Sequence, residues 1–172
     1  MLSLLEALGR RGWIVRQAAR PRELLPAAIS ARYVGLSNEI RTFLSAIDVC
    51  RSPDETAWFL TADDYARTSG PAFRWNEIEI MGLEAAEGDL DWQREVTAFW
   101  DRHFPVMLAV HSDYDYLAVS LDSGAVVHGS APEPEEASPV AGSFSEFLRA
   151  MESEAAAVEA RYPLAIFLGA PG

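Results

Sequence analysis

The clearest hydrophobic pattern in the chain is a series of short apolar runs separated by acidic or glycine-containing turns. Residues 106–110 form one continuous apolar run. In residues 116–121 the larger aliphatic side chains of Leu117, Val119 and Leu121 lie on one face and alternate with Tyr116, Ala118 and Ser120 on the other. Asp122-Ser-Gly124 supplies a three-residue hairpin loop with glycine where a positive φ is needed. Residues 125–128 then form the second strand of that hairpin. This pattern predicts an antiparallel meander of at least three strands.

Apolar residues at helical spacing predict four helices around these strands, of which the N-terminal one is short. Their expected limits are residues 2–8, Ser37 to Ser52-Pro53, Asp91 to Pro105 and Ser143 to Tyr162-Pro163. Ser37, Asp91 and Ser143 are the expected N-caps, because their side-chain oxygens accept hydrogen bonds from backbone N–H groups of the first turn. The proline-rich residues 16–26 and 132–139 are expected to be irregular connections.

Shorter segments complete the predicted fold. Residues 56–60 suit a buried strand, and Thr61-x-x-Asp64 resembles a capping box that opens a brief helix. Residues 75–86 suit either a strand or a helix, and we expect a strand followed by a turn. Residues 164–168 are expected to form a short terminal strand. The fold class is therefore α+β, a single domain over residues 1–172 with a largely antiparallel or mixed sheet and helices packed around it.

The net charge of −12 narrows the kinds of partner. Residues 1–51 contain eight Arg and four acidic residues, whereas residues 52–172 contain six Arg and 22 acidic residues. An acidic surface repels nucleic acid and anionic membranes and attracts a basic protein. We therefore expect a protein partner, with no nucleic acid and no membrane involved.

The cytoplasm is the expected location of the chain. No segment approaches the roughly 20 apolar residues of a membrane span. The positive charges near the N-terminus follow the first apolar run, which is the wrong order for a signal peptide. The single cysteine, Cys50, excludes an internal disulfide and is interpreted as a small buried hydrophobic residue.

Six segments in succession resemble the SUKH superfamily, also called the SMI1/KNR4 family. They are Trp58-Phe-Leu, Phe73-Arg-Trp75, Phe99-Trp-x-x-His-Phe-Pro105, Tyr114-x-Tyr-Leu-Ala118, Asp122-Ser-Gly-Ala-Val-Val-His-Gly129, and Pro132-Glu-Pro-Glu-Glu136 leading into Ser143-Phe-Ser-Glu-Phe-Leu148. The resemblance is clearest over residues 55–150. Residues 1–35 diverge as an N-terminal helix and an irregular segment, and the Asn-Gly found in many members does not follow Phe43-Leu44.

The resemblance implies a SUKH-like α+β domain without catalytic activity. Bacterial members are mostly immunity proteins that bind and neutralise the cognate toxin effector domain of a polymorphic toxin system. Fungal relatives act as regulatory scaffolds that bind an endogenous partner. The expected function is thus that of an immunity protein, and the alternative is a regulatory scaffold.

If the opposed toxin is a nuclease with a basic groove, a carboxylate-rich surface can be steered onto that groove and cover it. The expected partner-binding acids are the exposed side chains of Asp113, Asp115, Glu133, Glu135 and Glu136, with Tyr114 and Tyr116 as aromatic anchors. The alternative is that these are ordinary solvated turn residues and that Tyr116 packs within the sheet.

Catalytic and metal sites are weaker hypotheses. His111-x-Asp113-x-Asp115 would place three ligands on one strand face, yet no fourth ligand is evident. Cys50 with one of the histidines would make a nucleophile and base, but none lies in a recognisable signature. We expect no catalytic residue, no metal and no cofactor, and a small hydrolase is the third possibility for the function.

Overall fold

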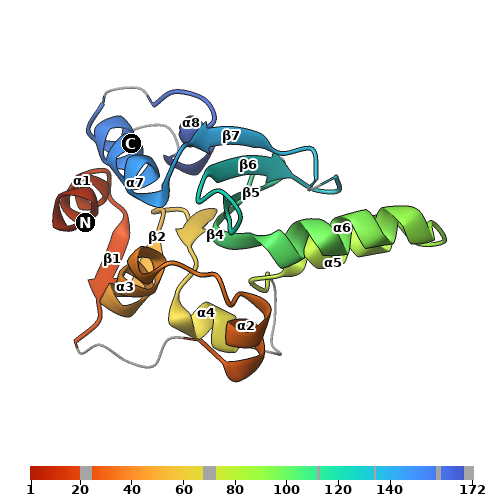
Figure 1. Ribbon diagram of the computed structural model, residues 1–172. Coiled ribbons are helices and arrows are strands. Elements are labelled where there is room, and N and C mark those ends of the chain that lie inside the picture. Colours follow the sequence, from red (N-terminus) through yellow and green to blue (C-terminus); the bar gives the residue numbers. More distant parts are fainter. Residues whose placement is uncertain (20–24, 68–72, 112, 134, 158–159, 169–172) are drawn as a thin grey trace.

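The strands follow one another across one sheet in the order in which they occur in the sequence (Figure 1). The computed structural model describes residues 1–19, 25–67, 73–111, 113–133, 135–157 and 160–168. The strands within these residues are β1 (Ile14–Gln17), β2 (Ile47–Arg51), β3 (Ala57–Phe59), β4 (His103–Val110), β5 (Tyr114–Ser120), β6 (Val126–Ser130) and β7 (Ser138–Ala141). Every neighbouring pair is antiparallel, so the predicted meander is confirmed and extends to seven strands.

The helices complete a mixed α+β fold. They are α1 (Leu2–Arg10), α2 (Ala27–Arg32), α3 (Asn38–Ala46), α4 (Ala62–Ala66), α5 (Glu77–Ala85), α6 (Leu90–Arg102), α7 (Phe144–Ala156) and α8 (Leu164–Leu168). Within the described part of the chain, none of them has the length and apolar character needed to cross a membrane. Their buried side chains join those of the strands in one hydrophobic core.

Side-chain caps determine where several helices begin. The Ser37 hydroxyl accepts from the Ile40 N–H and the Ser143 hydroxyl accepts from the Glu146 N–H, as the sequence predicts. The capping box at Thr61 is also present. Helix α6 differs, because the carboxylate that accepts the first N–H groups belongs to Asp89 and not to the predicted Asp91.

Helices cover both faces of the sheet. The ring of Phe59 on β3 lies 5.2 Å from that of Phe43 on α3 and 6.1 Å from that of Phe147 on α7. Phe59 is in register with Met107, and Met107 with Leu117, so these side chains share one face. Tyr116 points to the opposite face, where its ring lies 4.8 Å from that of Trp100 on α6.

Glycine 129 determines how Tyr116 packs. The two residues are in register on β6 and β5, and the phenol ring lies across the glycine toward α6. A Cβ atom at position 129 would lie 2.7 Å from Cζ of Tyr116 and 2.8 Å from its Cε1, which is closer than carbon atoms approach. The contact between the sheet and α6 therefore requires glycine here.

Helices α5 and α6 form an arm that extends beyond the sheet (Figure 1). Arg32 of α2 binds both helices at the base of the arm. Its Nη1 and Nη2 donate to the two carboxylate oxygens of Glu79 on α5, at 2.8 and 2.6 Å, and its Nε donates to Asp101 on α6 at 2.9 Å. Glu79 is buried, so this bidentate pair supplies the hydrogen bonds that a buried carboxylate needs.

Some sequence predictions of secondary structure were wrong. The helix that begins after Ser37 ends at Ala46 and not near Ser52-Pro53, because residues 47–51 pair with β1 as β2. Residues 77–85 form α5 where a strand was expected. In residues 164–168, Leu164, Phe167 and Leu168 are buried at helical spacing, so this segment is a helix and not a strand.

The two segments predicted to be irregular each contribute an edge strand. Arg16 and Gln17 belong to β1, and residues 138–141 form β7 beside β6. Residues 20–24, within the first of these segments, lie outside the described residues.

We predict that Gly129→Ala lowers the free energy of unfolding by about 1–3 kcal/mol, since the added methyl group displaces Tyr116 from α6. Urea denaturation followed by circular dichroism measures this loss. Gly9→Ala is the matched control, because a Cβ at this helical position meets no atom within 4 Å. It is expected to leave stability unchanged or to raise it by up to about 1 kcal/mol. Equal midpoints for Gly129→Ala and the wild type would contradict the packing described.

Candidate partner-binding surface

Two loops that carry predicted site residues meet at one end of the sheet. Asp113 lies in the turn between β4 and β5, and residues 131–137 connect β6 to β7. The Ala131 N–H donates to the carbonyl oxygen of Tyr114 at 3.0 Å, which places the start of β5 beside the end of β6. The structure therefore brings Asp113 and Tyr114 to the same end of the sheet as the glutamates of the β6–β7 loop.

The glutamates of this loop are not equivalent. Glu133 and Glu136 are exposed, whereas Glu135 is half-buried. Oε1 of Glu135 accepts a 2.6 Å hydrogen bond from the indole Nε1 of Trp92 on α6. This hydrogen bond to a charged group ties the loop to the helix and limits the conformations in which its neighbouring carboxylates are presented.

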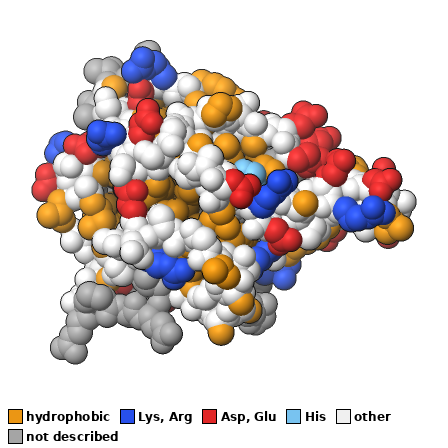
Figure 2. Space-filling view, in the orientation of Figure 1, with side chains coloured by type: hydrophobic (Ala, Val, Ile, Leu, Met, Phe, Trp, Pro, Cys, Tyr) orange, Lys and Arg blue, Asp and Glu red, His pale blue; other side chains and the backbone are white. Residues whose placement is uncertain are grey.

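The acidic region continues along the α5–α6 arm. Figure 2 shows acidic side chains gathered over the β6–β7 loop and at the outer end of α6. The exposed acids of the arm are Glu84, Glu87, Asp89, Asp91 and Glu95. We call these five residues together with Asp113, Glu133 and Glu136 the acidic end surface. Arg94 lies within it and pairs with Asp91 at 3.1 Å.

The arm acids were not among the residues predicted for the site. The signal available in the sequence was their density, since five acids fall between positions 84 and 95 around Gly88. These acids contribute to one surface only because α5 and α6 project together as a helical arm. The sequence analysis expected a strand and a turn at residues 75–86 and therefore did not predict that arm.

Tyr114 is the exposed member of a short aromatic row. Its side chain is 43% exposed, and its ring stacks on that of Phe73 with centroids 5.3 Å apart. Phe73 in turn meets Trp58 edge to face at 5.9 Å. Tyrosine in such a position presents a rigid amphipathic surface, so its role as an aromatic anchor stays a prediction that the geometry permits.

The expected exposure of Asp115 is wrong. Asp115 is only 6% exposed, and its Oδ1 accepts a 2.7 Å hydrogen bond from Nε2 of His128, which is itself buried. The reason is the two-residue period of β5, which turns Asp115 to the same face as the core residue Leu117. Tyr116 is fully buried as well, as the alternative interpretation held, so neither side chain reaches the surface.

The residues considered for catalysis or metal binding make other contacts. Nδ1 of His103 lies 2.8 Å from the carbonyl oxygen of Phe99, and burial lowers the pKa of His103. Nε2 of His111 lies 3.0 Å from the carbonyl oxygen of Ile166 on α8. Among the described residues, no group of three or more His, Cys, Asp or Glu is arranged to hold a metal ion.

Cys50 lies in the core and not in a reactive environment. The side chain is 2% exposed, and burial raises the pKa of the thiol to about 12. A reactive cysteine needs an accessible thiolate, which such burial suppresses. The structure thus gives Cys50 the surroundings of a packing residue.

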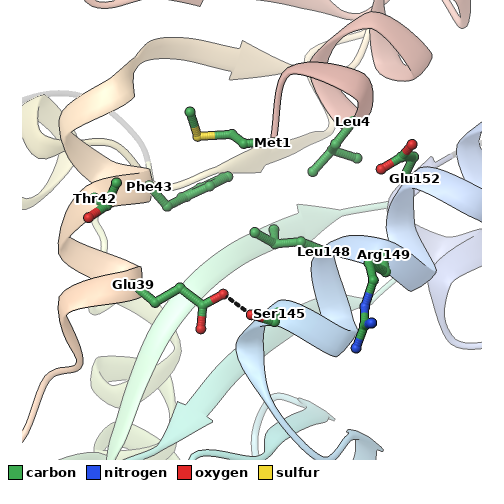
Figure 3. A pocket seen from close by; sticks show the side chains of 9 residues that line it. All are labelled: Met1, Leu4, Glu39, Thr42, Phe43, Ser145, Leu148, Arg149 and Glu152. Atoms are coloured by element: carbon green, nitrogen blue, oxygen red, sulfur yellow. Dashed lines mark hydrogen bonds between the residues drawn. The ribbon is translucent and has the colours of Figure 1, made fainter.

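A concave feature lies on the face of the sheet that α3 and α7 cover. It is a groove of about 700 Å³ between α1, α3 and α7 (Figure 3). Its lining residues are Met1, Leu4, Glu39, Thr42, Phe43, Ser145, Leu148, Arg149 and Glu152. No pattern in the sequence pointed to this groove, because its three walls are distant along the chain.

Comparisons of this chain with known protein families, with curated proteins and with solved structures found no match. The chemistry of the acidic end surface therefore has to be inferred from its own residues. Exposed carboxylates beside an aromatic side chain suit recognition of a basic protein surface.

We predict that Asp115→Ala and Asp113→Ala differ in stability although they lie two residues apart. Removing the buried carboxylate leaves His128 without its partner and is expected to cost about 2–3 kcal/mol. Removing the exposed carboxylate is expected to cost less than about 1 kcal/mol. Urea denaturation measures the free energy of unfolding of the two variants. Equal losses of stability would show that Asp115 is not in the buried pair described.

We also predict that Cys50 is unreactive in the native protein. At pH 8 a thiol of pKa about 12 is almost entirely protonated and shielded. Its reaction with a disulfide reagent such as DTNB should be at least about 100-fold slower in buffer than in urea, where one thiol is expected to react. Rapid reaction of the folded protein would restore Cys50 as a candidate nucleophile.

Proposed function

We propose that this chain is a non-enzymatic protein-binding domain of the SUKH type, an immunity protein that neutralises a cognate toxin effector domain. The observation that carries the proposal is the acidic end surface, which presents eight exposed carboxylates on two loops and a helical arm. The resemblance of residues 55–150 to the SUKH superfamily suggests a toxin domain as the partner. The negative charge of the acidic end surface favours a partner with a positively charged surface.

Electrostatics supports a basic partner. A patch of one sign raises the rate at which an oppositely charged protein arrives, by a factor that falls with ionic strength. A nuclease domain binds phosphate through positively charged side chains, and the carboxylates of the acidic end surface can form ion pairs with those same side chains. Binding in this way blocks the substrate without any chemical step in the inhibitor.

Rigid supports favour tight binding. The Trp92–Glu135 hydrogen bond holds the β6–β7 loop on α6, and Arg32 fixes the base of the arm through Glu79 and Asp101. A surface that is already ordered loses less conformational entropy when a partner binds. The carboxylates of the loop and the arm are thereby presented to the partner as one arrangement.

We predict that the wild-type chain protects cells that co-express the product of the gene directly upstream, and that the two proteins purify together. Neutralising Asp113, Glu133 and Glu136 to Asn or Gln is expected to weaken the complex at least about tenfold and to abolish protection. Cell survival and the dissociation constant measured by titration calorimetry are the two readouts.

The matched control neutralises three exposed acids outside this surface, Glu6, Asp63 and Asp122. It changes the net charge equally and should leave protection intact. If both triple variants protect as well as the wild type, the surface is wrongly assigned. If the upstream product is harmless and does not bind, the immunity function is wrong, and capture of an endogenous host protein would favour the regulatory scaffold.

A further inference from the structure

The ring of Tyr114 is covered on one face and open on the other. Tyr114 is 43% exposed, although its ring stacks on that of Phe73 with centroids 5.3 Å apart and planes at 26° to each other. Phe73 also contacts Trp58 of β3 edge to face. A ring supported in this way keeps one orientation, and its remaining exposure belongs to the face and edge that Phe73 does not cover.

The open face of the ring is turned toward β6. Trp58 lies on β3 and Tyr114 on β5, in a sheet whose strands follow one another in sequence order. Phe73 contacts both rings and therefore lies on the β3 side of Tyr114. On the β6 side, Ala131 donates its N–H to the carbonyl oxygen of Tyr114 at 3.0 Å, and its side chain is a single methyl group. That neighbour brings no long side chain against the ring.

Carboxylates follow directly on the β6 side. Glu133 comes two residues after Ala131, and its carbonyl oxygen accepts from the Glu136 N–H at 3.2 Å, so the two exposed glutamates share one turn. The turn leans over α6, because Glu135 accepts the hydrogen bond from Trp92 of that helix.

Tyr114 lies on the same face of the sheet as this turn. It precedes Tyr116 by two residues of β5, and alternate residues of a strand share a face. The Tyr116 ring lies 4.8 Å from that of Trp100 on α6, so both tyrosines are on the α6 side. Among the described residues, the guanidinium that lies over an aromatic ring is that of Arg32 over Tyr33, and none lies over Tyr114.

We propose that Tyr114 selects an arginine of the basic partner in preference to a lysine. The flat guanidinium stacks on the open face of the ring, while the N–H groups at its edge donate to the neighbouring glutamate carboxylates. A lysine ammonium is a compact and strongly hydrated charge, so it pairs with the carboxylates but gains less from the ring. The inference rests on the proposed function in that the partner is a basic protein, and it adds which basic side chain is recognised.

Other side chains of a partner suit this position less well. An apolar side chain covers the ring but leaves the adjacent carboxylates without water or a hydrogen-bond donor. A carboxylate is repelled by Asp113, Glu133 and Glu136. Arginine combines a flat face for the ring with a charged, hydrogen-bonding edge for the glutamates.

The test compares two fluorescent synthetic peptides of about eight residues, in which glycine alternates with arginine in one and with lysine in the other. Their dissociation constants for the full chain are measured by fluorescence anisotropy at about 0.05 M salt, where screening is weak. Because the peptides carry equal charge, the long-range attraction of the acidic end surface acts on both alike. We expect the arginine peptide to bind the wild-type chain about three- to tenfold more tightly.

Changes at the ring separate its contribution from that of charge. Tyr114→Leu should weaken the arginine peptide at least about threefold and change the lysine peptide by less than about twofold. Tyr114→Phe keeps the stacked ring and should preserve the preference for arginine. Tyr162→Leu is the matched control, because Tyr162 is 76% exposed and contacts His128, which is in register with Leu117 on the opposite face of the sheet. It should leave both dissociation constants unchanged.

Charge and position are tested separately. Neutralising Asp113, Glu133 and Glu136 should weaken both peptides at least about threefold, because each loses the same attraction. In the wild-type chain, the arginine peptide should shift the amide NMR signals of Tyr114 and Ala131. The proposal is overturned if the wild type binds both peptides equally, if Tyr114→Leu weakens both alike, if the neutralised variant binds both as the wild type does, or if those two signals do not move.

These measurements do not involve the upstream gene product. If that product does not bind while the preference for arginine is found, the immunity function is wrong and the arginine site at Tyr114 is retained. If the product binds and is neutralised but the preference is absent, the selection of arginine alone is wrong.

Discussion

Everything in this fold depends on burying the two central strands on both faces. Residues 104–109 of β4 and 115–120 of β5 are buried without the alternation of a half-exposed strand. A sheet with such a centre needs a helical layer on each side. Helix α6 supplies one layer, and α3 and α7 supply the main contacts of the other, with α1 packed against α7.

The acidic end surface and the groove between α1, α3 and α7 arise from these two helical layers. On one side α6 is longer than the sheet needs, so with α5 it projects and carries carboxylates away from the core. On the other side three helices share the cover and leave a trough where they do not meet. The acidic end surface is thus built from side chains that project, whereas the groove is built from side chains that the core already holds.

Local signals in the sequence were sufficient for the caps at Ser37, Thr61 and Ser143 and for the hairpin at Gly124, whose φ is +77°. The sequence predictions failed where the structure of a segment is determined by pairing with a segment distant in the sequence. Residues 47–51 continue an apolar helical spacing, yet pairing with β1 makes them a strand. Asp115 looked like a turn acid because the sequence does not show that β5 begins at Tyr114 and buries every following residue. The groove has no local signal at all.

The two edges of the sheet limit how this protein meets other chains. Both edge strands are only four residues long, and β7 contains Pro139, which has no N–H to offer. Short edge strands, one of them interrupted by proline, disfavour the addition of a foreign strand and with it edge-to-edge aggregation. Under the proposed function, recognition of a partner falls to side chains on loops and helices. Side chains at those positions can be replaced without disturbing the backbone hydrogen bonds of the sheet, so substitutions there can alter surface chemistry while the fold is kept.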